Sequence, residues 1–339
     1  MEKLAIVILN WNGCSLLEQF LPQLVQHTPD WAKIIIADNA STDNSLSWLQ
    51  THYPDIRTIV NEKNFGFAEG YNRALQQIDA QYYCLLNSDI EVSPHWLDSI
   101  VQYMDTHADT GICQPKLLSY HERQKFEYAG AGGGYIDKYG YPFCRGRMFA
   151  RTEKDLHQYD NICEIFWASG ACMFVRGELY HQLGGLDPHF FAHMEEIDFC
   201  WRAKLKGVKI IYYPSSVVYH VGGATLPKQS ARKTFLNFRN NMLLLYKNLP
   251  QNQLHHILAC RLVLDLIAAI SFLCQGHWGD FKAVFSARRA YRRMKGCYTR
   301  LRKEHPPRKV GNIYQKSIVW QYYAKRITLF SDLDSKDFR

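Results

Sequence analysis

The 339-residue sequence lacks the short motifs by which many enzymes bind phosphates or activate a nucleophile. It has no G-x-x-x-x-G-K-[ST] phosphate loop and no G-x-G-x-x-G after its first apolar run. The G-x-S-x-G and H-E-x-x-H motifs are also absent. A diphosphate ligand would therefore need a metal ion rather than a glycine cradle.

None of the ten cysteines belongs to a C-x-x-C pair, and most have apolar neighbours, as Cys84, Cys172 and Cys274 do. This predicts reduced thiols, buried as small hydrophobic side chains in a cytosolic compartment. A signal-peptide core is missing as well, because the apolar run 4–9 is short and polar Asn10 follows at once. We expect that run to be a buried strand.

Acidic residues are scarce in one segment near the C-terminus. Residues 282–309 hold eleven of the 40 Lys and Arg residues but only one of the 32 acids, Glu304. The segment thus carries +10 and the rest of the chain −2, although the total is +8. A nucleic-acid-binding surface spread over the whole chain is therefore disfavoured.

The first hundred residues alternate continuous apolar runs with helical patterns. Continuous runs indicate strands buried on both faces, hence a parallel sheet flanked by helices. A polar loop follows each run, and ligands bind at the carboxyl ends of the strands in open α/β sheets. We therefore predict a binding cleft beyond the runs at 4–9, 33–38, 56–60 and 82–87.

The middle of the chain is less regular. The Gly- and Tyr-rich segment 129–147 predicts a loop or ribbon. Residues 165–176 predict a strand kinked at Gly170, residues 195–207 a helix, and residues 208–214 a strand ended by Pro214.

Domain organisation follows from composition. No break in composition precedes residue 225, so 1–225 is predicted to be one mixed α/β domain. Residues 226–339 are predicted to be a helical C-terminal region that continues to the chain end, with interruptions at Pro250, near Gly276, and at Pro306 and Pro307.

Two acidic clusters could carry chemistry. Asp89 follows the run 82–87, where a carboxylate could hold a divalent cation, but by itself it is more simply a turn acid or a cap for a helix starting near Ser93.

The second cluster is Glu195, Glu196 and Asp198. These acids could supply favourable charge at a helix N-terminus, with Asp198 and Arg202 forming an i,i+4 pair. They could equally include a general base, because the apolar, aromatic residues before them would raise a carboxyl pKa.

Two further residues have double interpretations. Asp38 ends the run 33–38 and could accept a hydrogen bond from a nucleobase or sugar, or only cap the next helix. His220 follows a strand-like segment and could reach a metal, although a lone histidine is more often structural. Their order along a predicted α/β sheet is the stronger argument.

The ordered motifs resemble those of the family 2 glycosyltransferases with the GT-A fold, specifically a rhamnosyltransferase-like branch. The resemblance covers about residues 4–245. Its motifs are VILNWNG (7–13), DNASTDNS (38–45), NFGFAEGYNRAL (64–75), LLNSD (85–89), GGLDPHFFAHMEEIDFCWRAKLKG (184–207), VVYHVGG (217–223) and FRNNM (238–242). It implies a Rossmann-like, mainly parallel sheet with a nucleotide half at about 1–110 and an acceptor half at about 111–225.

The resemblance also implies roles for single residues. Asp89 stands where the last acid of the family's D-x-D motif coordinates Mg²⁺ or Mn²⁺, and His220 matches a histidine near the metal. Glu196 takes the place of the catalytic base, usually Asp, with Glu195 before it. The donor nucleotide would be held by Asn10, Asp38 (facing the pyrimidine), Asn64, Gly66, Asn72 and Arg73, and the acceptor side would be lined by Trp167, Gly170 and Asp187.

This sequence departs from the family pattern in two places. The metal motif reads Asn87, Ser88, Asp89 and has one acid, which makes metal affinity depend more on substrate phosphates. The base is Glu, one methylene longer than Asp, so either Glu195 or Glu196 could take the proton.

The implied reaction is transfer of a sugar, with anomeric inversion, from a nucleoside diphosphate sugar to a glycan or lipid-linked glycan in cell-surface polysaccharide synthesis. dTDP-rhamnose is the first candidate donor, and UDP-sugars follow. The alternatives are a non-catalytic sugar-nucleotide-binding or scaffold protein and a nucleic-acid-binding protein that uses its basic C-terminal helix.

The C-terminal region suggests a membrane surface. The apolar run 257–274 contains Arg261 and Asp265, which disfavour a membrane span and favour a buried or membrane-facing helix. Residues 281–303 combine apolar side chains at helical spacing with many arginines, the pattern of a helix on anionic lipid. Alternatively, that helix packs on the catalytic domain. We expect a cytoplasmic protein, peripheral on the cytoplasmic face of the membrane.

Overall fold

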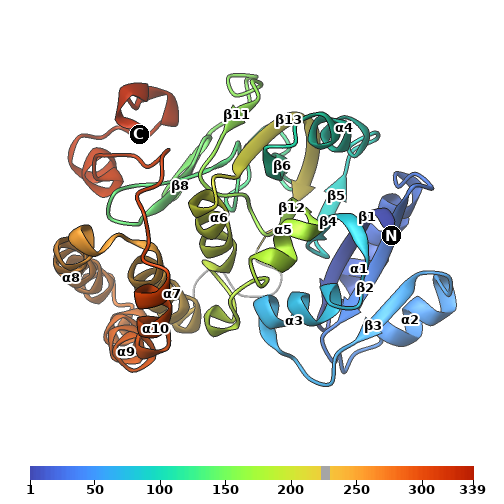
Figure 1. Cartoon of the computed structure of the whole chain (residues 1–339), viewed down its shortest axis with the longest axis horizontal. Helices are drawn as coiled ribbons and strands as arrows, with labels where there is room; N and C mark the ends of the chain where they lie inside the picture. Colours follow the sequence, from blue (N-terminus) through green and yellow to red (C-terminus); the bar gives the residue numbers. More distant parts are fainter. Residues whose placement is uncertain (223–229) are drawn as a thin grey trace.

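The computed structural model describes residues 1–222 and 230–339. Gly223, the end of the VVYHVGG motif, and the predicted boundary at 225 lie outside the described residues. Within them, a nine-stranded sheet has the order β11-β13-β6-β12-β4-β1-β2-β3, with β5 paired to β13 (Figure 1). Its strands are β1 (Glu2–Asn10), β2 (Ala32–Asp38), β3 (Arg57–Val60), β4 (Ala80–Leu86), β5 (Ile90–Val92), β6 (Thr110–Ser119), β11 (Cys163–Glu164), β12 (Cys172–Arg176) and β13 (Lys209–His220).

One half of this sheet confirms the prediction from the four apolar runs. β4, β1, β2 and β3 are parallel neighbours, with Ile6 opposite Ile34 and Cys84. Alternate residues point to opposite faces, so Ile6 and Val7 belong to different hydrophobic clusters. Both faces are covered by helices, namely α1 (Cys14–Gln26), α2 (Ser45–His52) and α4 (Asp98–Thr106) on the face of Ile6 and α3 (Gly66–Leu75) on the other.

The other half of the sheet is mixed. β12 is antiparallel to β4 and β6, while β13 is parallel to β6. The predicted strand 165–176 is wrong in its first part, because only Cys172–Arg176 pair in the sheet. β13 continues past Pro214, since a register shift between Tyr213 and Val217 accommodates the proline.

The remaining elements of the α/β part follow the predictions more closely. Helix α6 (Glu195–Leu205) forms where it was expected, preceded by α5 (Gly177–Gln182). The predicted ribbon is a small antiparallel sheet of β7 (Gly134–Ile136), β8 (Pro142–Cys144), β9 (Arg147–Met148) and β10 (Arg151–Thr152).

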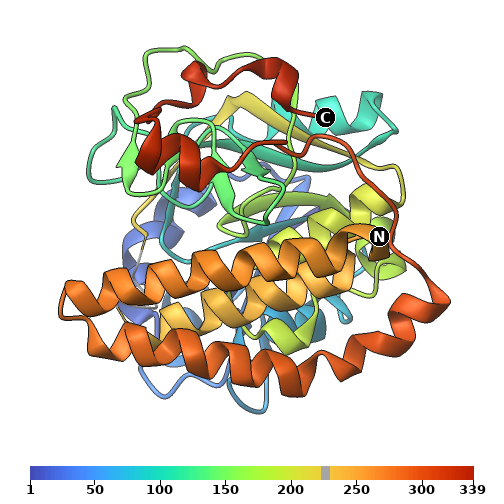
Figure 2. The same ribbon diagram turned by 90° about the vertical axis from the view of Figure 1, so that its left-hand side faces the viewer.

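Four helices form the C-terminal region, and α7, α8 and α9 run side by side as a layer (Figure 2). They are α7 (Ala231–Asn248), α8 (Gln251–Cys274), α9 (Trp278–Met294) and α10 (Gly296–Glu304). α7 packs on α6, and Leu243, Leu244 and Leu245 join the hydrophobic cluster of the sheet. Beyond residue 304 only short helical turns occur, so the prediction of helix to the chain end is wrong there.

The basic helix packs differently from its predicted membrane-facing arrangement. Val284, Ala287, Tyr291 and Tyr298 are buried in the protein, so most of the apolar side of α9 and α10 contacts the domain rather than lipid. Packing on the domain was the alternative interpretation, and the structure supports it. The buried position predicted for Cys274 is also wrong, because this thiol is exposed, although all ten cysteines are unpaired as expected.

Helix α8 is long and apolar enough to cross a membrane by length and composition alone. Its two charged side chains face the protein, however. Arg261 pairs with Asp265 at 3.0 Å, and Asp265 accepts a second ion pair from Arg288 at 2.9 Å. Arg261 also donates to the carbonyl of Tyr139. These contacts hold α8 along the domain.

Candidate active site

The ends of β1 and β2 meet in a buried polar contact. The Asn10 amide donates to a carboxylate oxygen of Asp38 at 2.9 Å, and both side chains are fully buried. Asp38 also accepts hydrogen bonds from the backbone N–H and the hydroxyl of Ser41. Asp38 thus holds the loop after β2 but does not cap the next helix, because α2 begins at Ser45 with Asn44 at its N-cap. The amide oxygen of Asn10 has no partner within the described chain.

A buried asparagine that the motif assignment did not single out organises the next loop. Asn39 donates to the Asn64 side chain at 3.1 Å and to the Gly66 carbonyl at 3.0 Å. Its amide oxygen accepts from Asn61 and from the backbone of Phe65. Asn39 could have been identified from the sequence, because it directly follows Asp38 at the edge of the sheet where a ligand is predicted to bind.

Gly66 and Arg73 are two further residues of the predicted donor site. Gly66 has φ +78°, and a Cβ there would lie 2.6 Å from the ring of Phe191, so this position requires glycine. Arg73 pairs with Glu69 and stacks over the ring of Phe65 at 3.8 Å.

Asn72 makes its contacts inside the fold. It donates to the Leu186 carbonyl and accepts from Tyr180 and from the Leu186 backbone. These bonds give Asn72 a structural role, in place of the nucleotide contact expected for it.

Asp89 lies in a buried charged group at the start of β5. Its Oδ1 is 3.2 Å from His220 Nε2, and its Oδ2 accepts from the backbone of Gly222. On the other side of the ring, His220 Nδ1 is 3.2 Å from Glu127 Oε1. Asp89 does not cap a helix, because strand β5 follows it, but it does lie in a turn, which was the other simple interpretation.

Electrostatics in this group favour ionised carboxylates. Burial disfavours the charge of Asp89, but contact with His220 lowers its pKa below the ordinary value. Burial likewise opposes the charge of His220, yet Glu127 and Asp89 raise the pKa of this imidazole to about 10. Glu127 lies in a loop 38 residues beyond Asp89, and no motif in the sequence pointed to it.

This donor set fits a divalent cation once His220 has lost its proton. Asp89 and His220 hold a carboxylate oxygen and a ring nitrogen 3.2 Å apart, and both are suitable ligands for Mn²⁺ when the imidazole is neutral. Histidine ligands of metals usually present their other ring nitrogen to a carboxylate, which orients the ring. Glu127 occupies that place, although its contact with Nδ1 falls short of hydrogen-bond geometry.

Glu195 and Glu196 lie in the first turn of α6 and have no cationic partner among the described residues. One buried carboxylate oxygen of each side chain lacks a hydrogen bond within the described chain. Burial raises the pKa of Glu196 to about 7. Burial and then the charge of Glu196 raise the pKa of Glu195. These are the properties expected of a general base that operates near neutral pH.

A strained turn leads into these two acids. Phe191, His193 and Met194 have φ values of 65°, 68° and 73°, which non-glycine residues seldom adopt. Asn240 of α7 donates to the carbonyls of Phe190, Ala192 and His193, and Arg239 donates to that of Phe190. Strain of this kind persists only where surrounding contacts impose it, and it is concentrated at functional sites. The FRNNM motif therefore holds the turn before Glu195.

Backbone contacts bring these groups to one edge of the sheet. Phe67, in the predicted donor-binding loop, donates its backbone N–H to the Phe191 carbonyl at 2.8 Å. Asn87 donates to the carbonyl of Ala171 at 2.9 Å. A Cβ on the neighbouring Gly170 would lie 3.8 Å from Glu196 Cβ. The donor loop, the metal motif and the acid pair are thus close neighbours.

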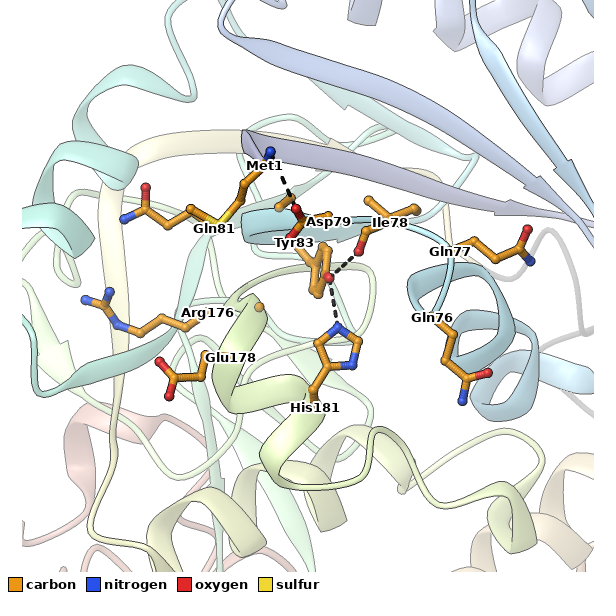
Figure 3. Close-up of a pocket in the computed structure, with 12 residues that line it drawn as sticks. Met1, Gln76, Gln77, Ile78, Asp79, Gln81, Tyr83, Arg176, Glu178 and His181 are labelled. Carbon is orange, nitrogen blue, oxygen red and sulfur yellow. Dashed lines mark hydrogen bonds and ion pairs between the residues drawn. The ribbon is translucent and has the colours of Figure 1, made fainter.

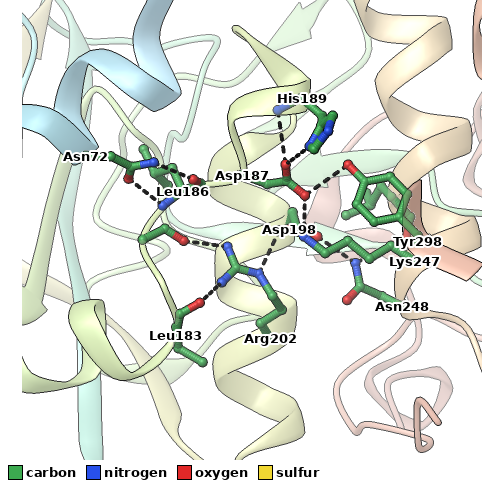
Figure 4. Close-up of polar contacts among 12 residues, drawn as sticks. Asn72, Leu183, Leu186, Asp187, His189, Asp198, Arg202, Lys247, Asn248 and Tyr298 are labelled. Atoms are coloured by element: carbon green, nitrogen blue, oxygen red, sulfur yellow. Dashed lines mark hydrogen bonds and ion pairs between the residues drawn. The ribbon is translucent and has the colours of Figure 1, made fainter. Parts of the chain in front are cut away.

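Two of the three predicted acceptor-side residues have other roles. Trp167 is buried and donates to the Tyr135 carbonyl at 2.9 Å. Asp187 pairs with Lys247 at 2.6 Å and accepts from Tyr298 at 2.9 Å (Figure 4). Both side chains are used inside the protein, and the acceptor-side role expected of them stays a prediction. Gly170 alone lies beside an acid of the site.

The same polar network holds α6 in place. Lys247 also pairs with Asp198 at 2.8 Å, and Asp198 accepts from Arg202 at 2.8 Å, as the i,i+4 spacing predicted (Figure 4). The side-chain amide of Asn248 also donates a hydrogen bond to Asp198. Asp198 thus has several partners, whereas Glu196, two residues earlier, has no cationic partner among the described residues.

A depression of about 640 Å³ lies at the opposite edge of the sheet. It is lined by the start of β1 and β4, with Tyr83 and His181 in contact at 2.9 Å (Figure 3). It contains none of the predicted site residues. Strand amino ends meet there, so we assign no catalytic role to it.

Known proteins resemble this chain in sequence. The family model described as glycosyl transferase family 2 matches residues 5–167. N-acetylglucosaminyl-diphospho-decaprenol L-rhamnosyltransferase of Mycobacterium tuberculosis is 25% identical over 234 residues, 65% of this chain and 76% of that protein. Rhamnosyltransferase WbbL of Escherichia coli is 24% identical over 197 residues, 56% of this chain and 72% of that one.

Solved structures share the fold at low sequence identity. GalNAc-T7 with UDP, GalNAc and Mn²⁺ superposes with a TM-score of 0.57 at 15% identity, covering 74% of this chain and 49% of that one. The mannosyltransferase PcManGT of Pyrobaculum calidifontis, in complex with GDP-Man and Mn²⁺, has a TM-score of 0.51 at 15% identity, covering 86% and 75%. The predicted GT-A-like fold with a helical C-terminal region is thus confirmed. Residues 5–167 thus match a family 2 glycosyltransferase domain, and the chain is a glycosyltransferase.

Proposed function

We propose that this glycosyltransferase moves a sugar, rhamnose first among the candidates, from dTDP-rhamnose or a UDP-sugar to a lipid-linked glycan. The observation that carries the proposal is the meeting of two differently charged groups at one sheet edge. Asp89 and His220 form the first, and Glu195 and Glu196 form the second. The rhamnosyltransferases among the similar proteins support this choice of sugar.

In the proposed reaction, the Glu196 carboxylate removes the proton from an acceptor hydroxyl, which then attacks the anomeric carbon of the donor sugar. The bond from that carbon to the diphosphate breaks on the opposite face, so the anomeric configuration inverts. Glu196 fits the base better than Glu195 because it is half-buried rather than fully buried and lies beside Gly170.

Asp89 and His220 would hold a divalent cation, Mg²⁺ or Mn²⁺, which when bound would neutralise the donor diphosphate. Glu127 would fix the orientation of the His220 ring. Asn10, Asp38, Asn64, Gly66 and Arg73 would surround the nucleotide, with Asp38 facing the pyrimidine. Mn²⁺ in the complexes of GalNAc-T7 and PcManGT supports a metal-dependent reaction.

A lipid-linked acceptor places the enzyme at the cytoplasmic face of the membrane in this proposal. The +10 segment supports that location, since anionic lipid attracts clustered Lys and Arg. The non-catalytic scaffold and the nucleic-acid-binding protein are not favoured, because neither explains two carboxylate groups with opposite pKa shifts at one edge.

The proposal is tested by a donor screen. We expect dTDP-rhamnose or a UDP-sugar, with Mg²⁺ or Mn²⁺, to raise the melting temperature, since a ligand that binds only the folded state stabilises it by mass action. The same donor should be hydrolysed slowly without acceptor. If no nucleotide sugar shifts the melting temperature in either metal, the proposed donor class is wrong.

A further inference from the structure

Helix α8 presents an apolar face to the outside of the molecule. This face, which we call the α8 face, consists of Leu262, Val263, Leu266, Ile267 and Ile270, each between 38% and 58% exposed. The spacing of three and four residues places these side chains along one side of the helix. Contiguous exposed apolar side chains of this kind mark interaction surfaces.

The charged side chains of α8 do not interrupt this face. Arg261 and Asp265 are the only charged residues in the helix, and both are buried in ion pairs on its inner side. A partner that covers the α8 face would therefore meet no charge along it. The inward pair also argues against a membrane span, because a spanning helix would have to abandon these contacts with the domain.

Helix α9 adds exposed cations and aromatic rings to the same side of the molecule. It follows α8 through a turn at Gly276, and the two helices lie side by side (Figure 2). Trp278 and Phe285 are exposed, at 61% and 45%. Four exposed cations of α9 have no ion pair within the described chain, namely Lys282, Arg289, Arg292 and Arg293.

Charge decides between two possible occupants of this surface. A second copy of the chain would bring two +10 segments together, and like charges repel at such a contact. Anionic lipid complements the same charge, and exposed Trp side chains favour the boundary between headgroups and acyl chains. We propose that the α8 face and the four α9 cations dock on an anionic membrane surface, with α8 lying in the plane of the interface.

This inference deepens the proposed function, because a lipid-linked acceptor would be met at that surface, but its test needs no sugar. Full-length protein is floated with phosphatidylcholine vesicles that contain or lack phosphatidylglycerol. We expect binding only to the anionic vesicles, weakened by salt. The double variant Ile267→Glu, Ile270→Glu should lose about tenfold or more of that binding, because two apolar side chains no longer enter the interface.

A matched control is Leu156→Glu, which places a charge at an exposed leucine far from α8 in the chain and should leave binding unchanged. Charge reversal at Arg289, Arg292 and Arg293 should remove the preference for anionic vesicles. All of these side chains are exposed, so the melting temperatures should stay close to that of the natural protein.

Three results would overturn the inference. The first is equal flotation of the Ile267→Glu, Ile270→Glu variant. The second is a dimer in sedimentation without lipid that this variant dissociates, which would make the α8 face an interface between copies. The third is resistance to extraction at high pH, which would indicate a spanning helix. Donor binding, measured separately by thermal shift, tests the proposed function on its own, so either proposal can fail alone.

Discussion

Two groups of carboxylates lie at the same edge of one sheet, and the protein surrounds them in opposite ways. Asp89 and Glu127 face an imidazole between them, and the pKa of Asp89 is lowered. Glu195 and Glu196 are successive residues at the start of α6 with no cationic partner among the described residues, and burial raises the pKa of Glu196 to about 7. Partners, more than burial, decide the difference, since Asp89 and Glu195 are both buried.

The comparison has a chemical meaning. A cation ligand must stay ionised at all working pH values, whereas a base must bind a proton and release it near neutral pH. Each group has the environment that its proposed task requires. Changing one residue, or the pH, at a time tests this assignment.

The largest effect is expected from Glu196→Gln, which removes the proposed base and keeps the shape. Turnover should fall by about 10²–10⁴-fold, the usual contribution of general base catalysis. Donor affinity should stay within a few-fold, because the lost interaction is made mainly in the transition state. Steady-state kinetics and donor titration measure both. A larger loss in Glu195→Gln than in Glu196→Gln would exchange the roles of the two residues.

A second change removes one cation that two buried acids share. Lys247→Met should leave Asp187 and Asp198 without this cation and lower the free energy of unfolding by about 3–5 kcal/mol. Denaturant unfolding measures this loss. Lys209→Met is the control, since its pair with Asp109 is half exposed and such pairs contribute little to stability. Equal losses in both variants would show that the buried network contributes little.

The third change concerns Glu127, in the group that contains Asp89 and His220. Glu127→Gln removes the charge that faces His220 Nδ1, and loss of such a contact typically costs about 10–100-fold in metal affinity. Mn²⁺ titration followed by electron paramagnetic resonance reads this out without turnover. Glu122→Gln, at an exposed acid of the same loop, should leave the affinity unchanged. An unaltered affinity in Glu127→Gln would mean that His220 needs no orienting carboxylate.

The smallest change is one of pH. Glu196 must be ionised to accept a proton, so kcat/KM should fall about tenfold per unit as the pH drops below about 7 and level off above it. The residual activity of Glu196→Gln should lack this dependence. A profile that turns near pH 4.5, where an ordinary glutamate titrates, would contradict the raised pKa.

Much of the fold could be predicted from the sequence, because it depends on local pattern. Continuous apolar runs identified the parallel strands, and the acids at the start of α6 identified its first turn. Pro214 misled the prediction, since a register shift inside β13 was not visible in the pattern. The apolar side of α9 was visible, but whether lipid or protein covers it depends on tertiary packing.

Site residues that belong to sequence motifs could be predicted. Asp89, His220 and Glu196 follow from the resemblance, and the structure brings their surroundings to one edge. Glu127 comes from an ordinary loop, and only folding places it against His220. Asp187 also belongs to a motif, but the motif could not reveal its contacts with Lys247 and Tyr298, which are distant in sequence.

The strained turn before Glu195 has a consequence for how this enzyme can be divided. Asn240 and Arg239 hold that turn, and both belong to α7, beyond the segment that the family model matches. A shortened chain that ends before residue 230 would lose those donors, and residues 191–194 would relax to ordinary backbone angles. The C-terminal helices are therefore part of the catalytic unit, and engineers seeking a minimal or chimeric transferase must carry α7 along with the sheet.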